Sequence, residues 1–273
     1  MNIQSARLLA KWWIALKVAP IVAGLIVARF VISELDLEFV DSVSLFGTIV
    51  AADVFVLGFL LAGTLADYKE GERLPSDLAS SIESMADEFL ITVAAHPGAE
   101  PRAGLSAVAH LATGVRRWLY REVATPEVME QITGLNEHLR AMEPMSQPQY
   151  VTRLKQEQAL TRKMIMRIET IRDTQFVVAG YAMAELGTAA VIAGFLFLEI
   201  SSGTQAALFT GIVSFLLIYL VMLIHDLDNP FDHYKSHPEA ARVSLHAIHD
   251  VEQRLQGYVA DEEVATPSLA AGG

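Results

Sequence analysis

The stretch VSLFGTIVAADVFVLGFLLAGTLA, residues 43–66, carries one charged residue, Asp53. About 20 predominantly apolar residues suffice for a helix to cross a bilayer, so this stretch is long enough to span a membrane. Phe55 and Phe59 are four residues apart, which places them one above the other on one face of a helix. At about 100° per residue, Asp53 projects about 140° away from their mean direction. The stretch therefore predicts a membrane helix with an aromatic face and an acid on the opposite side.

Three further stretches are apolar enough and long enough to span a membrane: 12–32, 176–198 and 207–224. The first of them is interrupted by Lys17 and Arg29, which lie a few residues from its ends, where long side chains can reach the interface. The whole chain is 52% hydrophobic and only 19% charged, which is unusually apolar for a soluble domain. We therefore expect an all-α membrane protein with four transmembrane helices per subunit.

The distribution of lysine and arginine predicts the orientation of these spans. Residues 1–11 hold two such residues, 67–175 hold thirteen and 225–273 hold three, whereas the loops 33–42 and 199–206 hold none. Because basic residues are enriched on the cytoplasmic side, both termini and the central region are expected in the cytoplasm. The chain then divides into four parts: 1–66 with the first two spans, 67–175 in the cytoplasm, 176–224 with the last two spans, and 225–273 as a cytoplasmic segment with a disordered tail.

The cytoplasmic region 67–175 is predicted to be helical. Residues 76–93 and 103–121 place apolar side chains at three- and four-residue spacing, which is typical of amphipathic helices. Thr125 is expected to be the N-cap of a third helix, with Pro126 at its first position. A fourth helix is expected to run from residue 151 through 173 and directly into the third span.

Several classes of function are disfavoured by composition and motifs. The chain has no cysteine and a net charge of −12, which argues against thiolate metal sites and against a nucleic-acid partner. The sequence lacks the HExxH, GxxxxGK[ST], GxSxG and GxGxxG motifs, so we expect no enzyme. A histidine- and aspartate-rich stretch follows the fourth span, but its spacing matches no standard metal site, and we expect no metal there. Its members are His225, Asp226, Asp228, Asp232, His233 and His237.

Two acids, Asp53 and Glu185, lie near the middle of spans, where a charge costs at least ~2.5–3.5 kcal/mol on insertion scales. Asp53 is expected to face the helix bundle and to form a structural salt bridge with Arg29, which we favour over a permeation site. Glu185 has no obvious partner in the sequence and is expected to be protonated.

Two further features each allow two interpretations. Taken alone, Phe55 and Phe59 are expected to pack against neighbouring helices or lipid; the alternative is that they line a pore. The basic residues of 151–173 are explained by membrane topology, which we favour, or by a positive lining for an ion path. These residues are Arg153, Lys155, Arg162, Lys163, Arg167 and Arg172.

Three stretches resemble the bestrophin family of ion channels. FVLGFLLAGTLADYKEGERLP, residues 55–75, is similar to the family's second span and the segment after it. LDNPFDHYKSHPEAARVSLHAIHDVEQRL, residues 227–255, resembles the stretch after the fourth span, with an NPF motif at Asn229, Pro230 and Phe231. SARLLAKWWIALK, residues 5–17, is a weaker match to the N-terminal segment.

The resemblance implies a homopentamer with five copies of the second span around one axial pore. It places the family's hydrophobic neck at Ala51, Phe55 and Phe59, where rings of bulky apolar side chains dewet a narrow pore and gate it. Ala51 is small where the family is bulky, which implies a neck that is shorter or easier to wet. Animal members bind calcium through a dense acidic run after NPF; here FDHYKSHPE holds only Asp232 and Glu239 as acids, so no cofactor is expected.

From these features we expect a bestrophin-like ion channel of the bacterial branch. It would be a multi-pass protein of the cell inner membrane that conducts small ions passively, with anions, such as chloride, slightly favoured over monovalent cations. The expected partners are further copies of the chain, membrane lipid and the permeant ions. Two alternatives remain open: a non-conducting membrane scaffold, and a small transporter that uses Asp53 and Glu185 as a proton relay.

Overall fold

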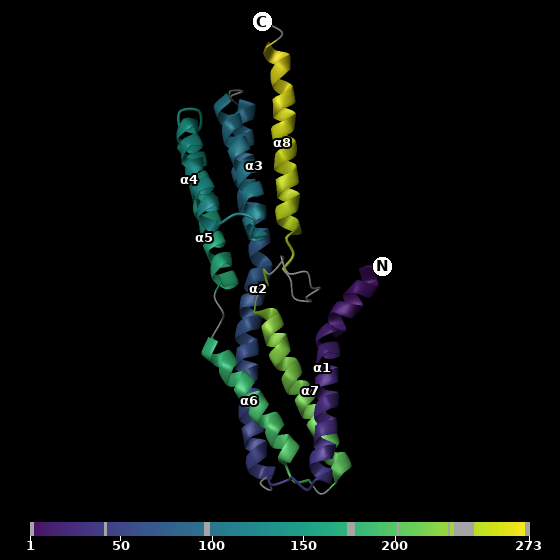
Figure 1. Ribbon diagram of the computed structural model, residues 1–273. Helices are drawn as coiled ribbons and strands as arrows, with labels where there is room; N and C mark the ends of the chain where they lie inside the picture. The colour runs from purple at the N-terminus through teal and green to yellow at the C-terminus, as the bar shows by residue number, and fades with distance from the viewer. Residues whose placement is uncertain are drawn as a thin grey trace. The chain divides into compact units, whose positions relative to one another are not determined.

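The computed structural model describes residues 3–40, 43–95, 99–173, 178–200, 202–228, 230–231 and 243–270. The described residues form helices with no strand, apart from one isolated bridge between Val40 and Leu198 (Figure 1). The helices are α1 (Ile3–Glu34), α2 (Val43–Ala95), α3 (Ala99–Leu119), α4 (Thr125–Met142), α5 (Pro148–Asp173), α6 (Val178–Phe197), α7 (Gly203–Leu227) and α8 (His246–Ala270).

Four of these helices are long and apolar enough to cross a membrane: α1, α2, α6 and α7. The prediction of an all-α membrane protein with four spans per subunit and a helical remainder is therefore confirmed. The α2 helix is longer than expected, because it continues from the span through Pro75 to Ala95. Proline lacks an amide hydrogen and leaves the carbonyl of Gly71 without its helical partner. The neighbouring Leu74 and Leu78 are buried, and their packing supports the helix on both sides of this defect.

The chain divides into two compact units, each with its own core. The four-helix unit comprises α1, α2 up to Lys69, α6 and α7. Its main core joins three of these helices through Phe46, Leu57 and Leu60 of α2 and apolar side chains of α6 and α7. A second cluster packs α1 against α7. The loop after α1 is tied to the end of α6, since the amide of Glu199 donates to the carbonyl of Val40 at 2.8 Å.

The five-helix unit comprises α2 from Glu70 onward, α3, α4, α5 and α8. Its core is continuous and includes Leu78 and Phe89 of α2 together with Trp118 of α3, all 1% exposed or less. Two ion pairs join its helices: Arg116 of α3 pairs with Glu252 of α8 at 2.7 Å, and Arg254 of α8 pairs with Glu83 of α2 at 2.7 Å.

The start of α4 differs from the sequence prediction. Thr125 does not cap α4: the N-cap is Ala124, whose amide donates to the Glu127 carboxylate at 3.2 Å. The Thr125 hydroxyl instead accepts a hydrogen bond from the Trp118 indole at 3.0 Å. The expected continuity of α5 with the third span falls on residues 174–177, which lie outside the described residues.

Candidate pore-lining helix and intramembrane charges

The α2 helix has two different faces within the four-helix unit. Phe55 and Phe59 are 76% and 63% exposed, and Ala51, one turn earlier, is exposed on the same face. On the opposite face Leu57 and Leu60 are 0% and 2% exposed in the core shared with α6 and α7. The division follows from the helical period, because positions four apart share a face.

The two phenylalanines are not covered by other side chains of the same chain. A ring that is 76% exposed in one chain faces lipid, another copy or an aqueous path once the chain is in a membrane. Asp53 is 7% exposed and lies on the other side of the helix, in the direction that the helical period predicts.

Among the residues of the four-helix unit whose side chains the structure describes, Arg29 is the most buried charge, at 1% exposed. Its guanidinium donates to the Glu38 carboxylate at 2.6 Å and to the carbonyls of Leu196 at 3.2 Å and Leu198 at 2.9 Å. The expected salt bridge between Arg29 and Asp53 is therefore wrong. Arg29 instead fastens the end of α1 to its following loop and to the end of α6.

Glu38 lies in the loop between α1 and α2 and is the partner that sequence reasoning missed. Burial raises the pKa of its carboxyl, but hydrogen bonds from Arg29 and Ser33 and the Arg29 charge outweigh it, so the pKa lies below its usual value. The ion pair is thus formed by a fully buried guanidinium and a carboxylate that is 16% exposed.

Asp53 is 7% exposed and faces α6. Its Oδ2 accepts a hydrogen bond from the Thr188 hydroxyl at 3.1 Å. A Cβ atom built on Gly187 would overlap Oδ1 of Asp53, so glycine at this position lets the carboxylate lie against the backbone of α6. Among the side chains that the structure describes, none of lysine, arginine or histidine forms an ion pair with Asp53.

Glu185 has a partner, contrary to the expectation that it has none. The Nε2 atom of His225 lies 3.1 Å from its Oε1. The Nδ1 atom of His225 lies 2.9 Å from the carbonyl of Val221, which can only accept, so Nδ1 carries a hydrogen. Both side chains are about half exposed, at 49% and 55%.

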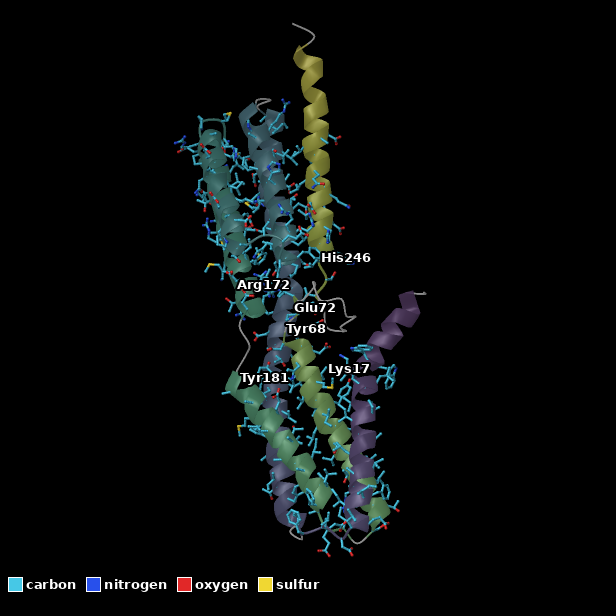
Figure 2. All side chains as sticks on the ribbon, in the orientation of Figure 1. Lys17, Tyr68, Glu72, Arg172, Tyr181 and His246 are labelled. Atoms are coloured by element: carbon cyan, nitrogen blue, oxygen red, sulfur yellow. The ribbon has the colours of Figure 1, made fainter. Side chains whose placement is uncertain are left out.

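A second polar contact lies beside this pair and joins the same two helices. Tyr181, labelled at the start of α6 in Figure 2, donates its hydroxyl hydrogen to Asp228 at 2.5 Å. The ring centroids of Tyr181 and His225 are 5.4 Å apart. These contacts occupy His225 and Asp228, and no group of three or more histidines and acids among the described residues is arranged to hold a metal ion. Asp232, His233, His237 and Glu239 lie outside the described residues.

The NPF motif is only partly within the described chain. Asn229 lies outside it, Pro230 is buried, and Phe231 is 0% exposed in the core of the five-helix unit. Phe231 therefore acts as a packing anchor for the segment that follows α7.

The basic residues of α5 are largely engaged in local contacts. Arg153 pairs with the buried Glu88 at 3.1 Å, and Arg167 pairs with Glu70 at 2.5 Å. Arg172, which is labelled in Figure 2, donates to the carbonyl of Trp118 at 3.3 Å, and its guanidinium lies over the Trp118 ring. Pairing with acids reduces the field that these cations can project, so α5 is not a uniformly positive surface.

Many solved structures are similar to this chain, and three of them illustrate the match. A bacterial bestrophin homologue from Klebsiella pneumoniae, carrying a point mutation, matches 91% of this chain and 98% of its own with a TM-score of 0.68 and 11% identity. A second structure of a bestrophin homologue from this organism gives a TM-score of 0.69 at 11% identity, over 91% of this chain and 98% of the other. A third structure, described as a membrane protein, gives a TM-score of 0.71 at 12% identity, over 90% of this chain and 98% of the other. No protein-family model matches the chain, and no curated protein matches it.

The fold and the four apolar helices define an all-α membrane protein. The chain has the fold of the bacterial bestrophin homologues, over about nine-tenths of its length. The resemblance read from residues 55–75 and 227–255 is thereby confirmed at the level of the fold.

Proposed function

We propose that the chain is one subunit of a homo-oligomeric, bestrophin-like ion channel, not an enzyme. Five copies, as the family resemblance implies, surround an axial pore lined by α2. Phe55 and Phe59 form a hydrophobic neck, with the smaller Ala51 one turn away. The channel lies in the cell inner membrane with both termini in the cytoplasm, and ions pass through it without coupling to another reaction.

The observation that supports this function best is the division of α2 into two faces. Phe55 and Phe59 are the two most exposed large apolar side chains that α2 presents, while Leu57 and Leu60 hold the other face in the bundle. Stacked phenylalanine rings from several copies make a narrow apolar constriction that water enters reluctantly, and such constrictions gate by dewetting.

We propose anions as the preferred ions by a slight margin, because the family includes chloride-conducting members. The basic residues of α5 add little to this preference, because Arg153 and Arg167 are paired with Glu88 and Glu70. The net charge of −12 favours cations, so selectivity must be measured with both ion classes.

The test is ion flux from liposomes that hold the purified chain, with chloride and potassium release followed in parallel. We expect a measurable leak for the parent chain and a faster one for the variant Phe55→Ala/Phe59→Ala, because smaller side chains let water enter the neck. The matched control is Phe209→Ala on α7, whose ring is 52% exposed but outside the proposed neck, and which should leave the flux unchanged.

Each alternative gives a different result in the same liposomes. A non-conducting scaffold gives no leak for the parent or for the double phenylalanine variant. A proton-coupled transporter gives exchange that depends on an imposed pH gradient and that Asp53→Asn abolishes, whereas a passive channel conducts without the gradient.

A further inference from the structure

The four-helix unit contains a large hollow between α2 and α6, and neither Phe55 nor Phe59 lines it. Its volume is about 670 Å³, within the range of about 300–1,000 Å³ that is usual for small-molecule sites. Its walls are apolar and several of them are small, including Ala52, Ala182 and Ala190. Met183 and Leu186 at its edge are 63% and 72% exposed, so an apolar molecule dissolved in the membrane can reach it.

The polar feature of this hollow is the carboxyl group of Asp53. Only its Oδ2 is hydrogen bonded, to the Thr188 hydroxyl, and Oδ1 accepts no hydrogen bond from the described residues. The side chain is 93% buried, being 7% exposed, and a carboxylate in such surroundings is stable only when a proton or a cation neutralises it. Nothing described in the chain supplies that cation.

A second hollow in the same unit lacks an acid and serves as an internal reference. It lies between α1 and α7, has a volume of about 410 Å³ and is lined by apolar residues including Val22, Gly211 and Phe215. The two hollows both suit an apolar chain. They differ in the carboxyl group, which selects for positive charge.

We propose that the hollow at Asp53 binds an amphiphilic amine: a narrow apolar molecule that carries one protonated primary amino group. The apolar body fills the space beside Ala182 and Ala190, and the ammonium group donates a hydrogen bond to Oδ1 of Asp53. Thr188 holds the carboxylate in place through Oδ2. A neutral lipid chain satisfies the apolar walls but leaves the carboxylate without a counter-charge, and a second copy of the chain has no lysine or arginine near the middle of its spans to supply one.

The test uses photo-crosslinking of the full-length chain in lipid nanodiscs. The probes are an alkylamine with a diazirine in its chain and the alcohol of identical length, and the labelled peptides are mapped by mass spectrometry. Unlabelled decylamine and decanol then compete, which gives an apparent affinity for each head group. We expect labelling of segments 49–56 and 179–191 with an amine preference on the order of 10- to 100-fold, as is typical for hydrogen bonds between charged groups.

Two variants separate charge from shape. Asp53→Asn keeps the size of the side chain but removes its charge, and should bring the apparent affinities for the amine and the alcohol to within about twofold of each other. Ala190→Leu fills the hollow without touching the carboxylate, and should weaken both probes. In every variant the hollow beside Val22, Gly211 and Phe215 should take both probes equally, which also reports that the unit remains folded.

Equal labelling of the Asp53 hollow by amine and alcohol in the parent chain would overturn the inference, as would no labelling there at all, the result expected if a second copy covers it. An amine preference that survives in Asp53→Asn would overturn it as well. Because labelling does not require conduction, these results are independent of the flux experiment: amine-selective labelling in a chain that does not conduct supports this site and contradicts only the channel.

Discussion

Substitutions that weaken the buried ion pair between Arg29 and Glu38 should lower the free energy of unfolding by different amounts. The guanidinium is 1% exposed and makes three hydrogen bonds, of which the one to Glu38 is also an ion pair and is 2.6 Å long. Replacing Glu38 with glutamine removes the negative charge but keeps a hydrogen-bond acceptor, so the loss should lie well below the cost of breaking a buried ion pair, about 3–5 kcal/mol. We therefore expect Glu38→Gln to lower the free energy of unfolding by about 1–2 kcal/mol.

Glu38→Ala removes the acceptor altogether and leaves a buried charge without its partner. Breaking a buried ion pair in this way costs about 3–5 kcal/mol, and the two carbonyl bonds that survive place the expected loss at the lower end. The free energy of unfolding can be measured by far-ultraviolet circular dichroism during titration of mixed micelles with sodium dodecyl sulfate. Glu34→Gln is the matched control, since Glu34 is exposed near the same loop and should change stability by less than about 0.5 kcal/mol.

The double variant Arg29→Met/Glu38→Gln removes both charges and should be more stable than Glu38→Ala, because no buried charge then lacks a partner. If Glu38→Ala and Glu38→Gln destabilise the chain no more than Glu34→Gln does, the ion pair between Arg29 and Glu38 contributes nothing to stability and the reasoning is refuted.

Three more predictions concern pH, core glycines and the intramembrane acid. Because the pKa of Glu38 is lowered in the folded chain, its ion pair should stabilise the protein fully above the unfolded-state pKa and progressively less as the pH falls through the folded-state pKa. The difference in melting temperature between the parent and Glu38→Gln, measured across this pH range, isolates the contribution of the ion pair. Gly104→Ala should destabilise the five-helix unit by about 1–3 kcal/mol, because its Cβ would overlap the buried Phe89 ring, whereas Gly134→Ala, with open space around it, should stabilise α4 by about 0.5–1 kcal/mol. Gly187→Ala should displace the Asp53 carboxylate and lower the melting temperature, whereas Gly134→Ala should raise it; equal melting temperatures of the two variants would contradict the contact seen at Oδ1.

The helical period was enough to predict both faces of α2. The spacing of Phe55 and Phe59 relative to Asp53 gave the correct directions, because a regular helix leaves no freedom in the angle between positions. The four spans were predictable for the same kind of reason, since bilayer thickness sets the length of an apolar helix.

The predicted pairing of Arg29 with Asp53 was wrong because it did not compare how deep the two residues lie in the membrane. Arg29 lies five residues before the end of α1 at Glu34, and Asp53 lies ten residues after the start of α2 at Val43. At 1.5 Å per residue their depths below the connecting loop differ by about 7.5 Å. Counting residues from that loop would have favoured an acid of the loop itself, such as Glu38, over Asp53.

Contacts between distant segments could not be read from the sequence. Thr188 and Gly187 meet Asp53, and His225 meets Glu185, through the packing of α6 on its neighbours, which no local pattern encodes. At Thr125 a local pattern was present but gave the wrong answer. Threonine is typical of helix N-caps, but the Thr125 hydroxyl instead accepts a hydrogen bond from the Trp118 indole, so the tertiary contact overrides the local preference.

Because the chain has no cysteine, a single introduced thiol reports directly whether α2 faces water in a central pore. Phe55→Cys should react with a water-soluble thiol reagent in the bilayer, and ion flux should fall as the modified side chain blocks the neck. Leu186→Cys, at a side chain that is 72% exposed compared with 76% for Phe55, should face lipid or another copy and stay unmodified. A Phe55→Cys thiol that stays unmodified in a conducting chain, or that is modified without any change in flux, would contradict a pore lined by this face of α2.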